Sequence, residues 1–187
     1  MLQKNITIRR LNSEDSLHLK EAEHLFQTTG AWGNLQNDTL KFFCESPNCA
    51  VFGAFDETKF IGCSVAGILG ERHFDFYKMY GTSLATKLIP GQIAHIIGVI
   101  LKDEYRGQGI GKELLKVRMK WARELGAKFA LSNSWVSKQS FNSARLFEAD
   151  GFQVVTRFTN FNPHGGNPCN FCGDICRCEN IVYLKEI

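Results

Sequence analysis

The sequence predicts a single mixed α/β domain (α+β, with a mixed sheet), and three observations support this. The chain has 187 residues, enough for one well-buried core and short for two. Hydrophobic residues make up 44% and charged residues 22%, as in an ordinary globular protein. Short apolar stretches bounded by turn residues alternate with segments whose apolar residues recur every three or four positions. We therefore expect residues 1–187 to form one domain.

Seven apolar stretches are predicted to be strands, because each is bounded by turn signals and is either alternating or continuously apolar. They are Asn5–Leu11, Ala50–Phe55, Lys59–Leu69, Ile93–Leu101, Lys128–Val136, Phe152–Phe158 and Asn180–Glu186. The second and third are joined by the short sequence "DETK", which predicts a hairpin.

Four helices are predicted between these strands. One follows the cap candidate Ser13, and a second lies near residues 34–46. The third runs from about Gly109 to Leu125, and the fourth lies near residues 140–150 with Ser140 as a candidate cap. The third has the strongest pattern, because its apolar residues form one stripe at helical spacing. The stripe consists of Ile110, Leu114, Val117, Trp121 and Leu125.

The charge balance and the absence of long apolar runs limit the classes of partner. The formal net charge is +3 without a long block of like charge, so we expect no nucleic-acid partner. No apolar run has signal-peptide character or the roughly 18 residues needed to span a bilayer. We expect a cytoplasmic protein with no membrane partner, and a homodimer stays open beside a monomer. Because cytoplasmic thiols stay reduced, the seven cysteines favour metal ligands or buried thiols over disulfides.

A glycine-rich turn in "VILKDEYRGQGIGKELL" is the most informative stretch of the chain. Gly107, Gly109 and Gly111 follow a predicted buried strand and open a helix. Glycines let backbone N–H groups turn toward a ligand, and the helix dipole favours an anion at that position. Arg106 and Lys112 add positive charge. The turn therefore predicts a site for a phosphate or pyrophosphate.

The spacing of the glycines excludes two common nucleotide-binding motifs. A P-loop would need glycine at Arg106 and serine or threonine at Glu113. A dinucleotide fingerprint would need glycine at Lys112 or at Leu114.

The pattern that fits is R-x-x-G-x-G, at Arg106, Gly109 and Gly111. With it, the chain resembles the GNAT superfamily of N-acetyltransferases, and "NSARLFEADGF" is similar to the family's pattern on its last helix. The alternative is a glycine-rich turn that only opens an amphipathic helix. The resemblance implies about seven mostly antiparallel strands with flanking helices, and acetyl-CoA as the co-substrate.

The resemblance also implies which residues contact acetyl-CoA. The glycine turn would hold the pyrophosphate, the backbone of the preceding strand would pair with the pantetheine, and an asparagine on the last helix would contact the pantetheine chain. These cofactor-binding residues are Val99, Leu101, Arg106, Gly107, Gln108, Gly109, Ile110, Gly111, Lys112 and Asn142.

Proton transfer is the step for which the sequence departs from the family. The position that often carries a tyrosine acid is Phe147, so the departing thiolate either leaves without help or takes a proton from Tyr105 or a water. His95, an isolated polar residue on an apolar strand, is the candidate catalytic base, and the alternative is a core histidine bonded to the backbone. Strand alternation does not decide which of the side chains Ser132, Ser134 and Trp135 face the cofactor.

Four cysteines near the C-terminus follow C-x2-C-x3-C-x-C, a spacing that resembles a zinc knuckle. They are Cys169, Cys172, Cys176 and Cys178. Four thiolates close the coordination shell, so a structural zinc is favoured over a catalytic one; free thiols and disulfides are the alternatives. The cluster falls in an insertion at 160–179 between the last two strands, the last hairpin of the fold, and we expect it to order that loop.

These features together predict an N-acetyltransferase that transfers the acetyl group of acetyl-CoA to an amine by direct attack. The acceptor stays open among small amines, antibiotics, protein lysines and N-termini. A non-catalytic acyl-CoA-binding or regulatory module and a zinc-stabilised interaction module are the alternatives.

Overall fold

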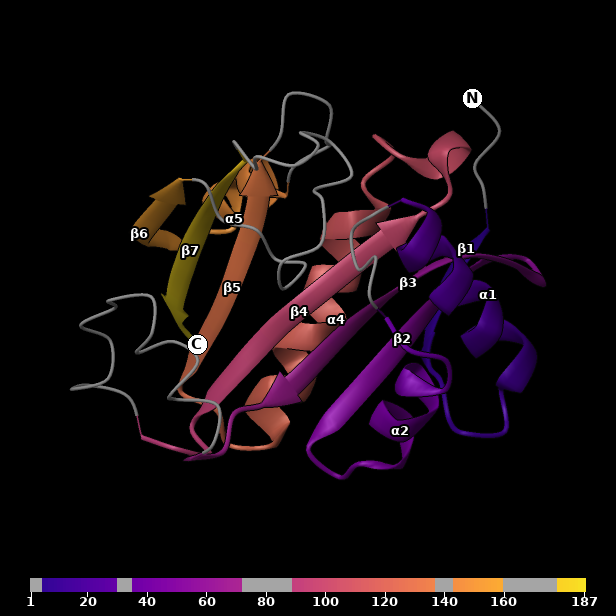
Figure 1. The fold of residues 1–187 in the computed structure, drawn as a ribbon, viewed down its shortest axis with the longest axis horizontal. Helices are drawn as coiled ribbons and strands as arrows, with labels where there is room; N and C mark the ends of the chain where they lie inside the picture. Colours follow the sequence, from indigo (N-terminus) through magenta and orange to yellow (C-terminus); the bar gives the residue numbers. More distant parts are fainter. Residues whose placement is uncertain (1–4, 30–34, 72–88, 137–142, 160–177) are drawn as a thin grey trace. The chain divides into compact units, whose positions relative to one another are not determined.

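The computed structural model describes residues 5–29, 35–71, 89–136, 143–159 and 178–187 (Figure 1). Its elements, in chain order, are β1 (Ile6–Arg10), α1 (Ser16–Thr28), α2 (Thr39–Glu45), β2 (Cys49–Asp56), β3 (Lys59–Ile68), β4 (Ile93–Leu101), the short 3₁₀ helix η2 (Asp103–Tyr105), α4 (Ile110–Glu124), β5 (Phe129–Val136), α5 (Ala144–Ala149), β6 (Gln153–Thr159) and β7 (Glu179–Glu186). The predicted mixed α/β class, the seven strands and their order are confirmed.

The described contacts divide the chain into two compact units. The first comprises residues 1–67 and 96–122, and the second comprises residues 68–95 and 123–187. The strand order is β1-β2-β3-β4 in the first unit, and the start of β4 followed by β5-β7-β6 in the second. The pairs β1–β2, β2–β3, β5–β7 and β6–β7 are all antiparallel, in agreement with the mostly antiparallel sheet that was expected. That residues 1–187 form one domain stays a prediction.

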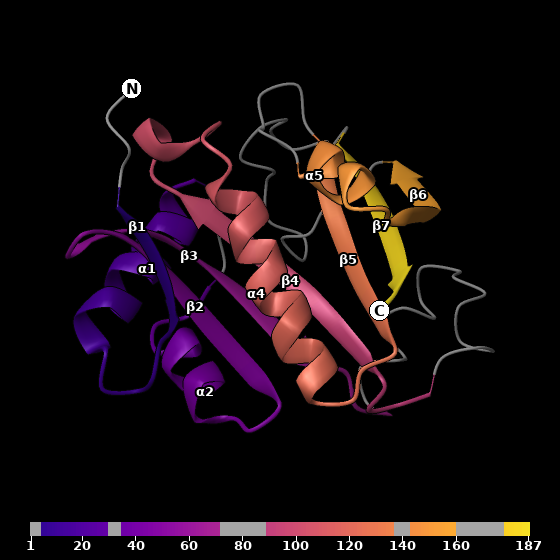
Figure 2. The ribbon, with the colours of Figure 1, turned by 180° about the vertical axis from the view of Figure 1, so that it is seen from behind.

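Helices cover both faces of the sheet in the first unit. Helices α1 and α2 lie on one face and α4 on the other, as the two opposite views show (Figure 1 and Figure 2). The predicted hairpin is confirmed, since Asp56 pairs with Lys59 at its tip. On the α1 side the core contains Phe26, Val51 and Val65, all almost fully buried.

Two of the predicted helix details need correction. Helix α1 begins at Ser16, and the residue at its N-cap position is Asp15 and not Ser13. The Asp15 carboxylate accepts a hydrogen bond from the Asn12 N–H at 2.9 Å and binds Arg9, which keeps the chain in a turn until that residue. Leu125 lies after the last residue of α4 and is 45% exposed, so it does not belong to the apolar stripe.

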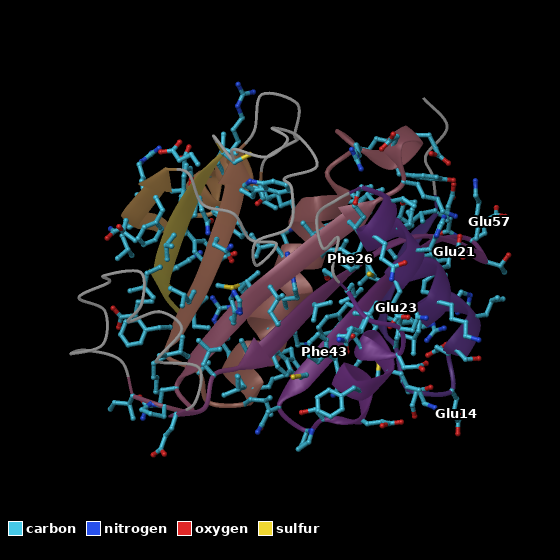
Figure 3. The ribbon with its side chains drawn as sticks, viewed as in Figure 1. Glu14, Glu21, Glu23, Phe26, Phe43 and Glu57 are labelled. Carbon is cyan, nitrogen blue, oxygen red and sulfur yellow. The ribbon has the colours of Figure 1, made fainter. Side chains whose placement is uncertain are left out.

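A buried glutamate joins α1 to α2. Glu23 is 5% exposed, and its carboxylate accepts hydrogen bonds from the N–H groups of Asp38 at 3.2 Å and Leu40 at 2.9 Å (Figure 3). These N–H groups lie at the start of α2, where no partner exists within the helix. The negative charge of Glu23 therefore caps α2 from the neighbouring helix.

The second unit is built on β7, which pairs with both β5 and β6. Leu69, Ile93, Leu131 and Val182 form its apolar core. The predicted last helix is confirmed as α5, which begins after Ser143; the candidate cap Ser140 lies outside the described residues. Among the described residues, no helix is long and apolar enough to cross a membrane.

Candidate functional site

The glycine turn between η2 and α4 has a backbone that only glycine adopts easily. Gly107 has φ +72° and Gly109 has φ +84°, both in the left-handed region. A Cβ built at either position would meet no described atom within 4 Å. Glycine is therefore required there by the backbone angle and not by crowding, and the outer side of the turn is open.

This turn presents a row of backbone donors. Among the described residues, the N–H groups of 107–111 donate to no protein oxygen; the first hydrogen bond of α4 runs from Lys112 N–H to the Gly109 carbonyl at 2.9 Å. Gly107, Gln108 and Gly109 are exposed. Such donors at the start of a 15-residue helix, whose dipole adds positive potential, form a site for an anion. We refer to residues 107–111 as the amide loop.

Arg106, which directly precedes the amide loop, binds two groups of the segment before it. Its Nε–H donates to the Leu101 carbonyl at 3.1 Å, and its Nη2 lies 2.9 Å from the Asp103 carboxylate. The guanidinium is thus already paired with the exposed carboxylate of Asp103, which the motif alone did not indicate. Lys112 lies in the first turn of α4 and adds positive charge to the loop.

The end of β4 is held tightly just before the amide loop. A Cβ on Gly62 of β3 would lie 2.8 Å from the Leu101 Cα, so β3 approaches β4 more closely than any other residue type would allow. Lys102 reinforces this segment: its Nζ donates to the Glu21 carboxylate at 2.6 Å and to the Phe60 carbonyl at 2.7 Å. Val99 and Leu101, the predicted pantetheine contacts, are half-buried on this strand.

The candidate acid Tyr105 is buried, and so is Phe147, which stands at the position that often carries a tyrosine acid. The Tyr105 hydroxyl donates to the Asp56 carboxylate at 2.9 Å, and this hydrogen bond raises the pKa of the phenol. Phe147 is 3% exposed and packs against Phe152 and Tyr183, with ring centroids 5.1 and 5.5 Å away. The hydrogen bond to Asp56 does not favour Tyr105 as a proton donor, and Phe147 has no proton to donate.

In the second unit, His95 belongs to a chain of polar side chains that crosses three strands. His95 Nε2 lies 3.4 Å from Asn133 Oδ1, and Asn133 Nδ2 donates to Asn180 Oδ1 at 3.3 Å. The carboxamide oxygen only accepts hydrogen bonds, so the contact is a hydrogen bond in the imidazole form that carries a proton on Nε2. Asn180 is 4% exposed, so this row of polar side chains ends in the protein interior.

Sequence reasoning did not identify Asn133 or Asn180. The polar residues in "FALSNSWV" were a signal, but alternation alone did not assign their faces. The structure does: the Ser143 hydroxyl donates to Ser134 at 3.2 Å, so Ser134 points toward the start of α5. Ser132 shares that face, and Asn133 and Trp135 lie on the other.

Of the four cysteines in the cluster, the structure describes one. Cys169, Cys172 and Cys176 lie outside the described residues, as does Asn142. Cys178 is described, with a thiol that is 1% exposed. Within the described ranges, no group of three or more potential ligands could hold a metal ion. The zinc site stays a prediction.

The described cysteines of the first unit are free thiols. Burial raises the pKa of the Cys63 thiol, and it raises the pKa of Cys44 to about 11. The Cys63 and Cys44 thiols are therefore protonated near neutral pH. Cys63 is a buried thiol, one of the two predicted uses of cysteine, whereas Cys44 and Cys49 are only half-buried.

The fold and the amide loop together define a class of protein: a mixed α/β fold whose backbone donors at the start of α4 are suited to an anion. Residues 17–152 match the sequence model of a protein family described as "Acetyltransferase (GNAT) family". The chain belongs to this family, and it is an acetyltransferase. No curated protein matches the chain in sequence.

Solved structures agree on the fold. Arabidopsis thaliana NAA60 in complex with acetyl-CoA is similar with a TM-score of 0.73 and 16% identity, over 98% of this chain and 99% of that one. An acetyltransferase of the GNAT family from Streptococcus pneumoniae has a TM-score of 0.68 and 16% identity, over 98% and 100% of the two chains. Ard1 from Thermoplasma volcanium has a TM-score of 0.65 and 13% identity, over 97% of each chain.

Proposed function

We propose that this protein binds acetyl-CoA through the amide loop and transfers the acetyl group to a primary amine by direct attack in a ternary complex. The observation that carries this proposal is the row of N–H groups at 107–111, which have no protein acceptor among the described residues. A pyrophosphate supplies several acceptor oxygens, and it would satisfy these donors where the helix dipole also favours negative charge.

The remaining contacts to acetyl-CoA are assigned by the family resemblance. The backbone of Val99 and Leu101 would pair with the pantetheine, an N–H of this strand would stabilise the oxyanion that forms when the amine attacks, and Asn142 would hold the chain. The clamped end of β4 supports this assignment, because a donor contributes to catalysis only when its position is fixed before the reaction.

For the base we propose His95. An attacking amine must lose a proton, and histidine is the side chain most often used for this near neutral pH. The contact with Asn133, itself held by Asn180, supports the role because it would orient the imidazole. Replacing His95 by Gln should lower kcat by about 10²-fold or more without a matching rise in the KM for acetyl-CoA.

The second candidate is a non-catalytic acyl-CoA-binding module, and Phe147 is the observation that favours it. Phenylalanine at this buried position supplies no proton to the leaving thiolate. Under our proposal the thiolate leaves unaided or takes a proton from water. The two candidates differ in one measurement: both bind CoA, but only the enzyme consumes acetyl-CoA in the presence of an amine.

The acceptor is best found with a panel of amines. The solved structures of similar fold include Arabidopsis thaliana NAA60 with a bisubstrate analogue and an aminoglycoside 6'-acetyltransferase type Ii. The panel should therefore contain peptides with free N-termini, lysine peptides, aminoglycosides and small amines, with thiol release as the readout. Absence of CoA binding by calorimetry would contradict the proposal at its first step.

We also propose a structural zinc at Cys169, Cys172, Cys176 and Cys178, on the strength of their spacing. Metal analysis of the purified protein should give about one zinc per chain, and changing Cys172 to Ser should remove it and lower the melting temperature. A metal-free wild-type protein of unchanged stability would refute this site.

A further inference from the structure

Arg118 is a charged side chain in the interior of the first unit. It lies on α4 and is 1% exposed. Its Nε–H donates to the Leu114 carbonyl of its own helix at 3.2 Å, and its Nη1 donates to the carbonyls of Gly98 at 3.2 Å and Val65 at 3.5 Å. Within the described ranges, Nη2 has no acceptor and no carboxylate pairs with the guanidinium.

Stability alone does not account for this residue. Burial lowers the pKa of Arg118 to about 9, which still leaves it positively charged at neutral pH. A buried charge without a counter-charge costs several kcal/mol, and carbonyl contacts offset only part of that. Its buried neighbours on α4, Leu114 and Leu115, show that an apolar side chain is compatible with this interface.

The arginine holds the backbone of β4 at one residue. Gly98, whose carbonyl it contacts, directly precedes Val99. Phe26 of α1 (Figure 3) reaches the same residue from the opposite face of the sheet. A Cβ on Gly98 would lie 3.3 Å from the Phe26 ring. Gly98 is therefore confined between Arg118 and Phe26.

Helix α4 contains Arg118, and the amide loop leads into the first turn of the same helix. Arg118 lies eight residues after Ile110, or about 12 Å along the helix axis. A contact between Arg118 and Gly98 thus sets the position of the amide loop relative to this part of β4. A ligand that bridges two sites gains affinity only when their spacing matches its length.

We infer that Arg118 is a positioning residue for acyl-CoA: it fixes the spacing between the amide loop, which would hold the pyrophosphate, and β4 at Gly98 and Val99, which would hold the pantetheine. The inference rests on the proposed function. It predicts that the loss of Arg118 weakens binding of whole CoA while the nucleotide half alone still binds the amide loop.

The test compares Arg118→Met with wild type by calorimetry, using CoA and its nucleotide half, 3′-phospho-ADP. Methionine fills most of the volume but offers no donor to Gly98. We expect the Kd of CoA to rise about tenfold, since small misplacements of bound groups have effects of this order. The Kd of 3′-phospho-ADP should change less than about twofold, and the melting temperature should stay equal or rise because an uncompensated charge is removed.

Two further variants keep the test decisive if Arg118→Met does not fold. Arg118→Lys keeps the charge and a single donor nitrogen, so it should bind CoA more tightly than Arg118→Met does but less tightly than wild type. Gly98→Ala perturbs the same residue from the Phe26 side and should also weaken CoA selectively. The matched control is Leu115→Val, which trims a buried side chain on α4 that makes no hydrogen bond to Gly98, and it should leave the ratio of the two Kd values unchanged.

Equal weakening of CoA and 3′-phospho-ADP in Arg118→Met, or no weakening of either, would overturn the inference. Wild-type CoA affinity in both Arg118→Lys and Gly98→Ala would do the same. A wild-type protein that binds neither ligand would instead contradict the proposed function, so the two failures are distinguishable.

Discussion

Alanine in place of Gly109 should separate the binding role of the amide loop from its contribution to stability. Gly109 and Gly126 stand just beyond the two ends of α4 with nearly the same backbone, φ +84° and +83°, and a Cβ at either would meet nothing within 4 Å. Each substitution therefore introduces the same left-handed strain, about 1 kcal/mol, and a similar fall of about 2–4 °C in melting temperature. Gly126→Ala is thus a control matched in strain, helix and surroundings.

The two variants should differ in their affinity for CoA. To relieve the strain, the backbone of Gly109→Ala would rotate the adjoining peptide groups and turn one N–H of the amide loop away from the ligand. A hydrogen bond to a charged group contributes about 1.5–3 kcal/mol, so a loss of about 2 kcal/mol raises the Kd roughly 30-fold. Gly126→Ala should bind CoA within about twofold of wild type.

Calorimetric titration with CoA, beside thermal melts of the same samples, measures both quantities. Wild-type affinity in Gly109→Ala would refute the assignment of the pyrophosphate to the amide loop. Equal weakening in the two variants would show that strain in α4, and not the direction of the N–H groups, controls binding.

Three other predictions concern the first unit. Arg9 lowers the pKa of Asp15 from 3.8 to about 2; this lowered value means that the carboxylate stabilises the fold fully above about pH 4 and loses that contribution as the pH falls toward 2. Asp15→Asn should therefore reduce the free energy of unfolding by about 1 kcal/mol at pH 6 and by almost nothing at pH 2, and a constant difference in urea titrations across this range would contradict it. Glu23→Gln keeps the shape of the side chain but removes the charge that caps α2, so the free energy of unfolding in urea should fall by about 1 kcal/mol. An unchanged free energy of unfolding would refute the capping role. Gly62→Ala should slow turnover and lower the melting temperature by several degrees, because its methyl group would lie 2.8 Å from the Leu101 Cα; a fully active, equally stable variant would show that β3 and β4 separate easily.

Local patterns explain why the sequence predicted so much of the fold. The strands were found within one or two residues, because alternation and turn residues act over neighbouring positions. The third helix was predicted at 109–125 and runs from Ile110 to Glu124 for the same reason. The amide loop was also predictable, since its chemistry comes from consecutive backbone groups and needs no partner from elsewhere in the chain.

Prediction failed for residues whose partners are distant in the chain. The contact between His95 and Asn133 joins residues 38 positions apart, and that between Asn133 and Asn180 joins residues 47 apart. The Tyr105 hydroxyl, a candidate acid from the sequence, is held by Asp56, 49 residues earlier. No period or motif encodes such pairs, because they depend on which strands become neighbours.

The sequence by itself therefore determined the order of elements, the glycine turn that forms the amide loop, and the family. Tertiary structure alone decided the surroundings of particular side chains: that Arg118 is buried and bound to Gly98, and that His95 lies beside the Asn133 carboxamide. The physical reason is that local backbone preference acts over a few residues, whereas burial and hydrogen bonding are set only when distant segments pack together.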